Sequence, residues 1–315
     1  MSFFNENISL GIDISDYKLR LVQLKKTGKK IRIVSFSEVE VTPGIIIDGI
    51  IQNKDYLSEL IDKLKKETVG YRLLTKKIIV GLPEKQSFIK LIETEKITAE
   101  EEEISKHLPF ALKDIYYDYQ ILPFTPWNDS PAIHCAAVKK NIVNDYLEIF
   151  SRVNWQPEVI ELETMSTARC LLPQKIYAPK NTSVIIDIGT ARTTISVICQ
   201  NLVIFSISFN SIIHQTKAYL SDLLISLRQV LEFYQQHLKA HNLLLDAIYT
   251  CGTGAYFKNL NNEIEKNTGL RSLMGNPWQN IALPLNNCAK KIKYPLAFAT
   301  AIGLALRPLQ NKNYI

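Results

Sequence analysis

A strand–turn–strand unit occurs twice in this chain of 315 residues, and this duplication constrains the fold more than any other sequence feature. The first copy covers residues 9–22, and the second covers residues 183–197; they align without a gap at an offset of 174 residues. Each copy has an acid, Asp13 or Asp187, near the end of an apolar strand, followed by a short turn, a basic residue and a second strand. A single copy is typical of an ordinary hairpin, but two copies predict two related halves.

The residue types in these turns suit the binding of phosphate. A turn of this kind exposes backbone N–H groups, which together with Ser or Thr hydroxyls and a nearby Lys or Arg can hold phosphate oxygens. A carboxylate at the end of the strand can hold Mg²⁺, usually through water. Asp13 and Asp187 are the strongest single candidates, and Lys18 and its counterpart Arg192 supply the basic residue of each turn. Two such turns facing each other would hold a nucleotide phosphate chain from both sides.

Length and composition indicate a globular protein with room for two domains, since 46% of the residues are hydrophobic. The net charge of +6 is mild, and the lysines fall in short groups separated by acids and apolar residues. This distribution favours a solvated face over a nucleic-acid site, while weak attraction to an anionic membrane remains open.

The cysteines and histidines indicate neither a disulfide framework nor a metal site. The five cysteines include no Cys-x-x-Cys pair, and the apolar neighbours of Cys135, Cys199 and Cys251 predict buried thiols. The five histidines show no metal-ligand spacing. No apolar run approaches the length of a membrane span, and the first residues lack the features of a signal peptide. We therefore expect a cytoplasmic protein that reaches a membrane only through a partner.

Hydrophobic periodicity predicts the same order of elements in both halves, namely three strands followed by a helix. The first set is predicted at 8–14, 18–25, 30–41 and 53–67, with the apolar alternation of the third strand interrupted near Ser35. The second set is predicted at 183–188, 193–199, 202–208 and 213–238. Between the two sets, a small α+β insert is predicted from strands near 77–82, 87–93, 116–122, 132–139 and 158–163, a helix that begins at Thr98 and a helix at 141–152.

Two glycine-containing segments follow the second set. Gly252 and Gly254 lie between a strand at 247–250 and a helix, where backbone can approach a ligand closely. Alone this is a weak signal, because a strand–glycine–helix joint is often only a tight turn. A helix at 295–306 carries small residues, including Ala301 and Gly303, which predict close helix packing. No nucleophile–base pair and no spare catalytic acid are recognisable.

Taken together, the two turns, the Gly252–Gly254 joint and the segment 301–307 resemble the actin/Hsp70/sugar-kinase superfamily. Within it, the residues Val80-Gly-Leu-Pro83, 98–112, 118–122, Glu161-Leu-Glu163 and 226–234 are similar to the PilM family, actin-like proteins of type IV pilus assembly. The similarity covers roughly residues 8–307, and FtsA, a cell-division protein with the same type of insert, is the nearest competitor.

The resemblance implies an α/β, actin-like (ribonuclease H-like) duplicated fold with an α+β insert. The first half would be 1–180, with its core at 8–75 and 164–180 and the insert at about 76–163, and the second half would be 181–315. It also implies ATP with Mg²⁺ between the halves, with Asp13 and Asp187 holding the metal. The residues implied to bind the nucleotide are Asp13, Ser15 and Lys18 in the first turn, Asp187, Gly189, Thr190 and Thr193 in the second, and Gly252 and Gly254 at the nucleoside.

The sequence departs from the family after Phe209, where a Gly-Gly turn and a small helical subdomain are missing. The second half is therefore predicted to be shortened, and the lost subdomain normally walls one side of the nucleoside. This weakens the interpretation as an enzyme. The leading hypothesis, which the resemblance implies, is a cytoplasmic scaffold of a type IV pilus or of a related secretion or DNA-uptake machine. It would bind the N-terminal peptide of a PilN-like bitopic inner-membrane protein and, beyond it, the pilus assembly ATPase. The alternatives are an actin-like ATPase or kinase and an FtsA-like protein; no nucleic acid is expected as partner.

Overall fold

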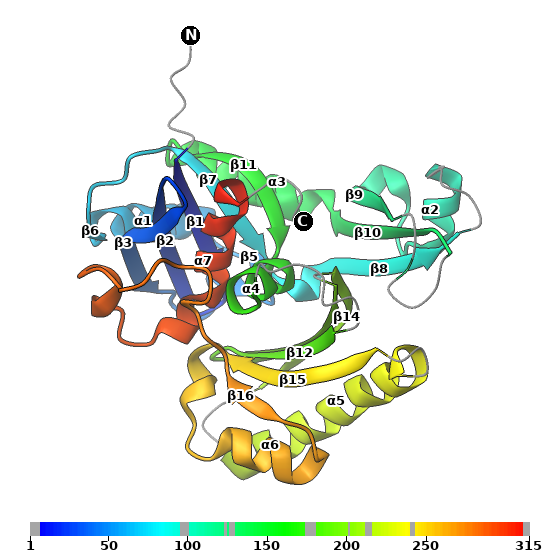
Figure 1. The fold of residues 1–315 in the computed structure, drawn as a ribbon. Coiled ribbons are helices and arrows are strands. Elements are labelled where there is room, and N and C mark those ends of the chain that lie inside the picture. The colour runs from blue at the N-terminus through cyan, green and yellow to red at the C-terminus, as the bar shows by residue number, and fades with distance from the viewer. Residues whose placement is uncertain are drawn as a thin grey trace.

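The computed structural model describes residues 7–94, 101–122, 125, 130–173, 181–200, 202–211, 216–239 and 243–310 (Figure 1). The predicted helix start at Thr98 and residues 212–215 of the shortened segment lie outside the described residues. The strands are β1 (Ile8–Ile14), β2 (Lys18–Thr27), β3 (Lys30–Glu40), β4 (Ile46–Ile47), β5 (Ile50–Ile51), β6 (Val69–Gly70), β7 (Lys77–Leu82), β8 (Ser87–Glu93), β9 (Ile115–Leu122), β10 (Ala132–Lys139), β11 (Gln156–Leu162), β12 (Asn181–Ile188), β13 (Arg192–Cys199), β14 (Leu202–Asn210), β15 (Leu244–Cys251) and β16 (Ser272–Met274). The helices are α1 (Lys54–Lys66), α2 (Glu101–His107), α3 (Lys140–Arg152), α4 (Glu163–Leu171), α5 (Thr216–His237), α6 (Leu260–Thr268) and α7 (Ala299–Leu306).

The duplication predicted from the sequence is present in the sheet topology. One sheet has the order β11-β7-β1-β2-β3-β6, and the other has the order β14-β13-β12-β15-β16. In each sheet an antiparallel meander of three strands is followed by a helix, α1 or α5, and a strand parallel to the first. The cross-strand register repeats as well, because Asp13 pairs with Arg20 and Asp187 pairs with Thr194. The connection between the third strand and the helix of the second half is short, since β14 ends at Asn210 and α5 begins at Thr216.

The boundaries predicted for the insert and for the second half need correction. The predicted insert of about 76–163 includes β7 and β11, which pair with the first sheet. The separate part is the three-stranded sheet β8-β10-β9 with α2, which projects to one side of the molecule (Figure 1). Helix α7 was assigned to the second half, but it packs against β1, β2 and β7 of the first sheet. Strand β7 belongs to the first sheet, where its apolar side chains are buried and it pairs in parallel with β1.

Helices α4 and α7 lie against each other between the two halves, where small residues allow close contact (Figure 1). A Cβ atom on Gly303 of α7 would come within 1.8 Å of the carbonyl oxygen of Ser166 in α4. A Cβ on Gly11 of β1 would lie 2.3 Å from the carbonyl oxygen of Ala301. The prediction that this small-residue helix packs closely is thus confirmed.

Other local predictions also hold. The interruption near Ser35 is a β-bulge, where the pairing of β3 with β2 skips Val34. Cys135, Cys199 and Cys251 are buried and free. Among the described residues, no helix is both long and apolar enough to cross a membrane.

Candidate functional site

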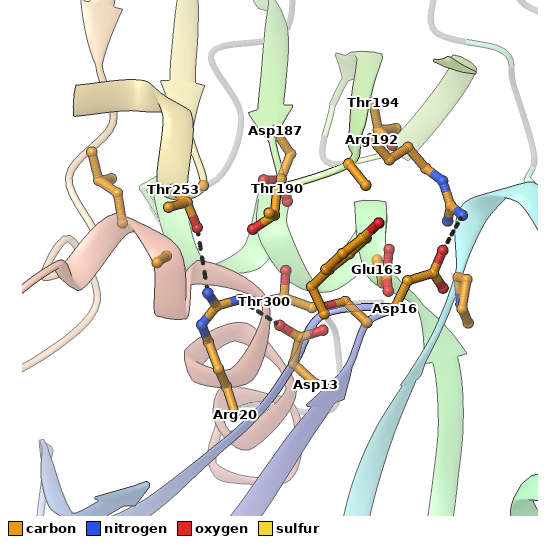
Figure 2. A pocket seen from close by; sticks show the side chains of 18 residues that line it. Asp13, Asp16, Arg20, Glu163, Asp187, Thr190, Arg192, Thr194, Thr253 and Thr300 are labelled. Carbon is orange, nitrogen blue, oxygen red and sulfur yellow. Dashed lines mark hydrogen bonds and ion pairs between the residues drawn. The ribbon is translucent and has the colours of Figure 1, made fainter. Parts of the chain in front are cut away.

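A small cavity lies where the two hairpin turns face each other, between the two sheets (Figure 2). Its volume is about 90 Å³. Both sheets contribute through the carboxyl end of their first strand, which places Asp13 of β1 and Asp187 of β12 in the wall. Helix α4 contributes Glu163 at its first residue, and Thr300 comes from α7. The sequence repeat therefore brings two segments that are 174 residues apart to the wall of one cavity.

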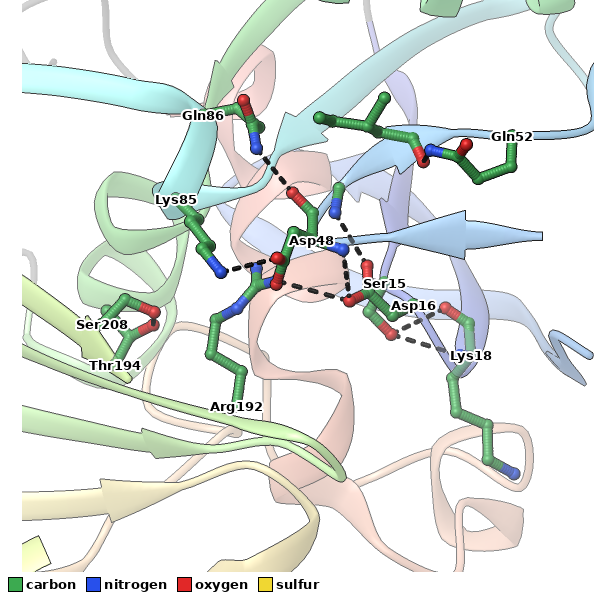
Figure 3. A network of polar contacts seen from close by, with 12 residues as sticks. Ser15, Asp16, Lys18, Asp48, Gln52, Lys85, Gln86, Arg192, Thr194 and Ser208 are labelled. Carbon is green, nitrogen blue, oxygen red and sulfur yellow. Dashed lines mark hydrogen bonds and ion pairs between the residues drawn. The ribbon is translucent and has the colours of Figure 1, made fainter. Parts of the chain in front are cut away.

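The first hairpin turn uses its polar groups on itself. The Ser15 amide and hydroxyl both donate to the Lys18 carbonyl, at 2.9 and 3.0 Å, and the Lys18 amide donates to the Ser15 hydroxyl at 3.2 Å. The Lys18 ammonium lies 3.3 Å from Glu38 and 3.0 Å from Glu40 of β3. Its side chain extends away from Asp16 and Arg192 (Figure 3) and is not part of the cavity wall. Lys18 therefore does not line the site, in contrast to the role that the resemblance implied for it.

Asp16 joins the two turns directly. Its carboxylate lies 3.4 Å from the guanidinium of Arg192, at the far side of the second turn (Figures 2 and 3). The same carboxylate accepts hydrogen bonds from the amides of Asp48 and Gly49, both at 2.9 Å. Arg192 also lies 3.4 Å from the Asp48 carboxylate, which pairs with Lys85 at 2.6 Å. The space between the turns is thus crossed by an internal ion-pair network.

Arg20 crosses the cavity at a second point. Its side chain lies 3.7 Å from Asp13 and donates to Glu38 at 2.7 Å and to Thr253 of the second half at 3.4 Å (Figure 2). Arg20 and Arg192 are the two basic side chains that line the cavity, and both have carboxylate partners in this structure.

Three carboxyl groups in the site have raised pKa values. Burial raises the pKa of Asp13 to about 6; Arg20 opposes this change and Asp187 adds to it. Burial, reinforced by Asp13, holds the pKa of Glu163 well above its usual range. Burial also raises the pKa of Asp187, although Arg20 and hydrogen bonds from Cys251 and Thr167 act in the opposite direction. The acids here are held in a setting that disfavours their charged forms.

The remaining predicted residues fall into two groups. Gly189, Thr190 and Gly252 line the cavity together with Asp13, Ser15 and Asp187. Thr193 is fully buried behind it, where its hydroxyl bonds to Ser211 and to Tyr219 of α5. Gly254 packs on Ile188, since a Cβ there would lie 2.2 Å from the Ile188 side chain.

Gly252 has a structural requirement of its own. Its φ is +80°, and a Cβ would lie 2.4 Å from both the Asp187 carboxylate and the Ile188 carbonyl oxygen. Close approach to β12 therefore accounts for this glycine, whether or not a ligand is present.

The residues present do not fit a phosphate chain with Mg²⁺ in this arrangement. The hydroxyl of the first turn is engaged with the turn itself, its lysine points away, and the ion pair of Asp16 and Arg192 spans the space between the turns. Among the described residues, no group of three or more His, Cys, Asp or Glu side chains is arranged to hold a metal ion. The cavity of about 90 Å³ is also far below the roughly 300–1,000 Å³ of ordinary small-molecule sites.

The sequence carried signals for two site residues that were not predicted. Arg20 stands directly opposite Asp13 in the β1–β2 hairpin, and counting back from the turn places the two side chains on one face. Glu163 follows strand β11, and β11, β7 and β1 are parallel, so their carboxyl ends meet at the same edge. The Asp16–Arg192 pair had no such signal, because it joins the two halves.

Known proteins resemble this chain both in sequence family and in fold. A family model described as type IV pilus assembly protein PilM matches residues 11–209. A solved PilM-PilN type IV pilus biogenesis complex is 18% identical, with 96% of this chain and 98% of that chain covered and a TM-score of 0.80.

Two more distant structures share the fold. The ethanolamine utilization protein EutJ from Carboxydothermus hydrogenoformans is 13% identical over 95% of this chain and 89% of that chain, with a TM-score of 0.53. MreB 5 of Spiroplasma citri bound to AMPPNP is 9% identical over 94% of each chain, with a TM-score of 0.51. These likenesses establish an actin-like fold.

Proposed function

Because the chain belongs to the PilM family of type IV pilus assembly proteins, we propose that it is a cytoplasmic actin-like scaffold that binds the N-terminal peptide of a PilN-like inner-membrane protein. The machine would be a type IV pilus or a related secretion or DNA-uptake system. The observation that supports this role is an apolar groove between the insert sheet and the first sheet.

The groove has a volume of about 260 Å³, and its lining is mainly apolar. Strands β9 and β10 form one side, β11 and the start of α4 form the other, and Leu82 lies at the end of β7. Apolar side chains that line it include Ala136, Val138, Val143, Ile160, Leu162 and Met165. An extended peptide with apolar anchors would be complementary to such a surface.

Two strand edges border the groove. Strand β9 pairs with β10 and with no other described strand, and β11 is the end strand of the first sheet. Tyr116 and Tyr119 of β9 are 47% and 41% exposed, which leaves aromatic surface available to a partner. An incoming strand could therefore gain main-chain hydrogen bonds at an edge and side-chain contacts in the groove.

One end of the groove is polar, and there a single carboxylate, that of Glu161, forms ion pairs with two arginines. Glu161 is buried and pairs with Arg169, which also donates to the Gly303 carbonyl at 3.0 Å. Arg307 pairs with the same carboxylate, but about a third of its side chain is exposed. Arg307 thus offers N–H donors to a peptide carbonyl or carboxylate at this end.

Recruitment to the inner membrane, and contact with the pilus assembly ATPase, would follow from the partner that the groove binds. We propose no enzymatic step, since the interdomain cavity is small and its cations already have carboxylate partners.

The test is peptide binding. A fluorescent peptide with the sequence of the PilN-like protein's cytoplasmic N-terminus is titrated with the protein, and anisotropy gives the affinity. We expect one peptide per chain, and an affinity at least about tenfold weaker for Tyr119→Ala, because aromatic anchors carry much of such an interface.

Tyr294→Ala is the matched control, because Tyr294 is 47% exposed, as Tyr116 is, and does not line the groove. This variant should bind like the wild type. Absence of wild-type binding, or equal loss in the two variants, would count against the groove.

A further inference from the structure

The first sheet gathers basic residues at the end that lies away from the interdomain cavity. Strands β1, β7 and β11 are parallel and start at this end, and the β2–β3 hairpin turns here because Lys25 pairs with Ile8. The last turn of α1 reaches the same end, where Lys65 donates to the Val153 carbonyl at 2.6 Å. The basic residues that these segments carry include Lys25, Lys29, Lys30, Lys65, Lys66, Arg72, Lys76 and Lys77.

A concavity of about 620 Å³ lies in this basic end. Lys65, Lys66, Arg72 and Lys76 line it, and no acidic residue does. Lys65 is held over the Trp155 ring, 4.5 Å from its centroid, and pairs with Asp62 at 2.9 Å. Within the described residues, Lys66, Arg72 and Lys76 have no carboxylate within 4.0 Å, so their charge is not balanced locally.

Exposed apolar side chains accompany these charges. Tyr71 is 67% exposed and Leu74 is 42% exposed, both on the loop that joins β6 to β7. The buried Gln23 side chain fixes this loop, because it donates to the Arg72 carbonyl at 3.2 Å and accepts from the Leu74 amide at 2.8 Å. The loop therefore presents an aromatic and an aliphatic side chain on a rigid base.

We propose that this basic face, formed by Lys66, Tyr71, Arg72, Leu74 and Lys76 with the neighbouring lysines, binds the headgroups of an anionic lipid bilayer. Lysines attract an anionic leaflet as point charges, and an exposed Tyr and Leu can enter the boundary between headgroups and acyl chains. A nucleic-acid site would favour arginine forks and base-stacking platforms, and this face has a single arginine in its concavity.

The position of the face agrees with the partner proposed above, and this part of the inference rests on the proposed function. Strand β11 begins beside the concavity and ends in the peptide groove, so that one edge strand of 7 residues connects the two surfaces. A peptide that follows this edge would leave the groove toward the basic face. Lipid contact would then add a second, weaker attachment to the one made by the partner. This proposal revises the expectation from the sequence that the protein reaches a membrane only through a partner.

The test uses the purified protein without any partner. It is mixed with vesicles of phosphatidylcholine alone or with an equal part of phosphatidylglycerol, and flotation measures the bound fraction at low and at physiological ionic strength. We expect the protein to bind the vesicles that contain phosphatidylglycerol and not those of phosphatidylcholine alone. The bound fraction should be smaller at physiological than at low ionic strength. The triple variant Lys66→Glu, Arg72→Glu, Lys76→Glu should bind at least about tenfold more weakly, since each basic residue near the surface contributes roughly fivefold.

The matched control reverses three exposed charges on the second half, Lys258→Glu, Lys266→Glu and Arg271→Glu, and should bind vesicles nearly as the wild type does. Equal loss in both triple variants, or no wild-type binding at low salt, would overturn the proposal. So would tighter binding to a duplex DNA fragment than to the anionic vesicles. The peptide titration separates the two proposals, because the basic-face variant should still bind the partner peptide.

Discussion

The guanidinium of Arg192 lies 3.4 Å from the carboxylate of Asp16, and this pair joins two hairpin turns that are 176 residues apart in the chain. In the actin-like site implied by the sequence, a phosphate chain would lie between these turns. Here an internal ion pair spans that space, so the two halves are connected without a ligand.

Asp16 should contribute more to stability than its partner. Asp16→Ala leaves the Asp48 and Gly49 amides without their acceptor, which we expect to cost about 3 kcal/mol. Arg192→Ala removes two contacts of 3.4 Å between partly exposed side chains and should cost about 1–2 kcal/mol, a value between those of exposed and of fully buried ion pairs. Urea unfolding measures both, with Asp16→Asn as an intermediate control because one amide oxygen remains as acceptor. Equal losses in the two alanine variants would show that the amide bonds are not the main contribution of Asp16.

Asp13 should make stability depend on pH. The pKa of this carboxyl rises from 3.8 to about 6 in the folded chain, so its contribution to stability is present below its unfolded pKa and is lost as the pH rises through about 6. In Asp13→Asn this loss is absent. The free energy of unfolding of the variant, relative to wild type, should therefore increase by about 2.5 kcal/mol between about pH 4 and about pH 8. A difference that does not change with pH would contradict the raised pKa.

ATP with Mg²⁺ should bind weakly or not at all. The internal ion pairs engage the basic side chains of the cavity, and the turn that carries Ser15 is satisfied by its own backbone. We expect a dissociation constant above about 1 mM and no phosphate release above background. Calorimetry and a phosphate-release assay measure these, with Asp187→Ala as the control. Micromolar ATP binding that Asp187→Ala abolishes would show that the cavity opens into a working nucleotide site.

Gly303→Ala should destabilise the contact between α4 and α7. The added Cβ would come within 1.8 Å of the Ser166 carbonyl oxygen, so one helix must move, and we expect a cost of at least about 3 kcal/mol. Gly269→Ala is the matched control, because its Cβ would meet nothing within 4 Å and only its positive φ of +68° opposes the change. That variant should lose about 1 kcal/mol. Thermal unfolding of both distinguishes a packing clash from a loss of backbone freedom.

The sequence alone determined the strands, the long helices and the duplication. These features depend on local apolar periodicity, so residues 8–14 and 183–188 are recognisable as equivalent strands from their residue pattern alone. The close helix packing at Gly303 was also predictable, because small residues at helical spacing have few other uses. The carboxyl ends of the equivalent strands β1 and β12 then brought Asp13 and Asp187 together in one cavity.

Only the tertiary structure decided which side chains engage one another. Lys18 forms ion pairs with Glu38 and Glu40 because β3 lies beside β2. Arg192 pairs instead with Asp16 of the opposite half. That β7 and β11 belong to the first sheet and not to the insert, and that α7 packs on the first sheet, likewise depended on which surfaces pack together across the chain. Ion pairs and packing partners depend on distances between segments far apart in the chain, and local sequence patterns contain no information on those distances.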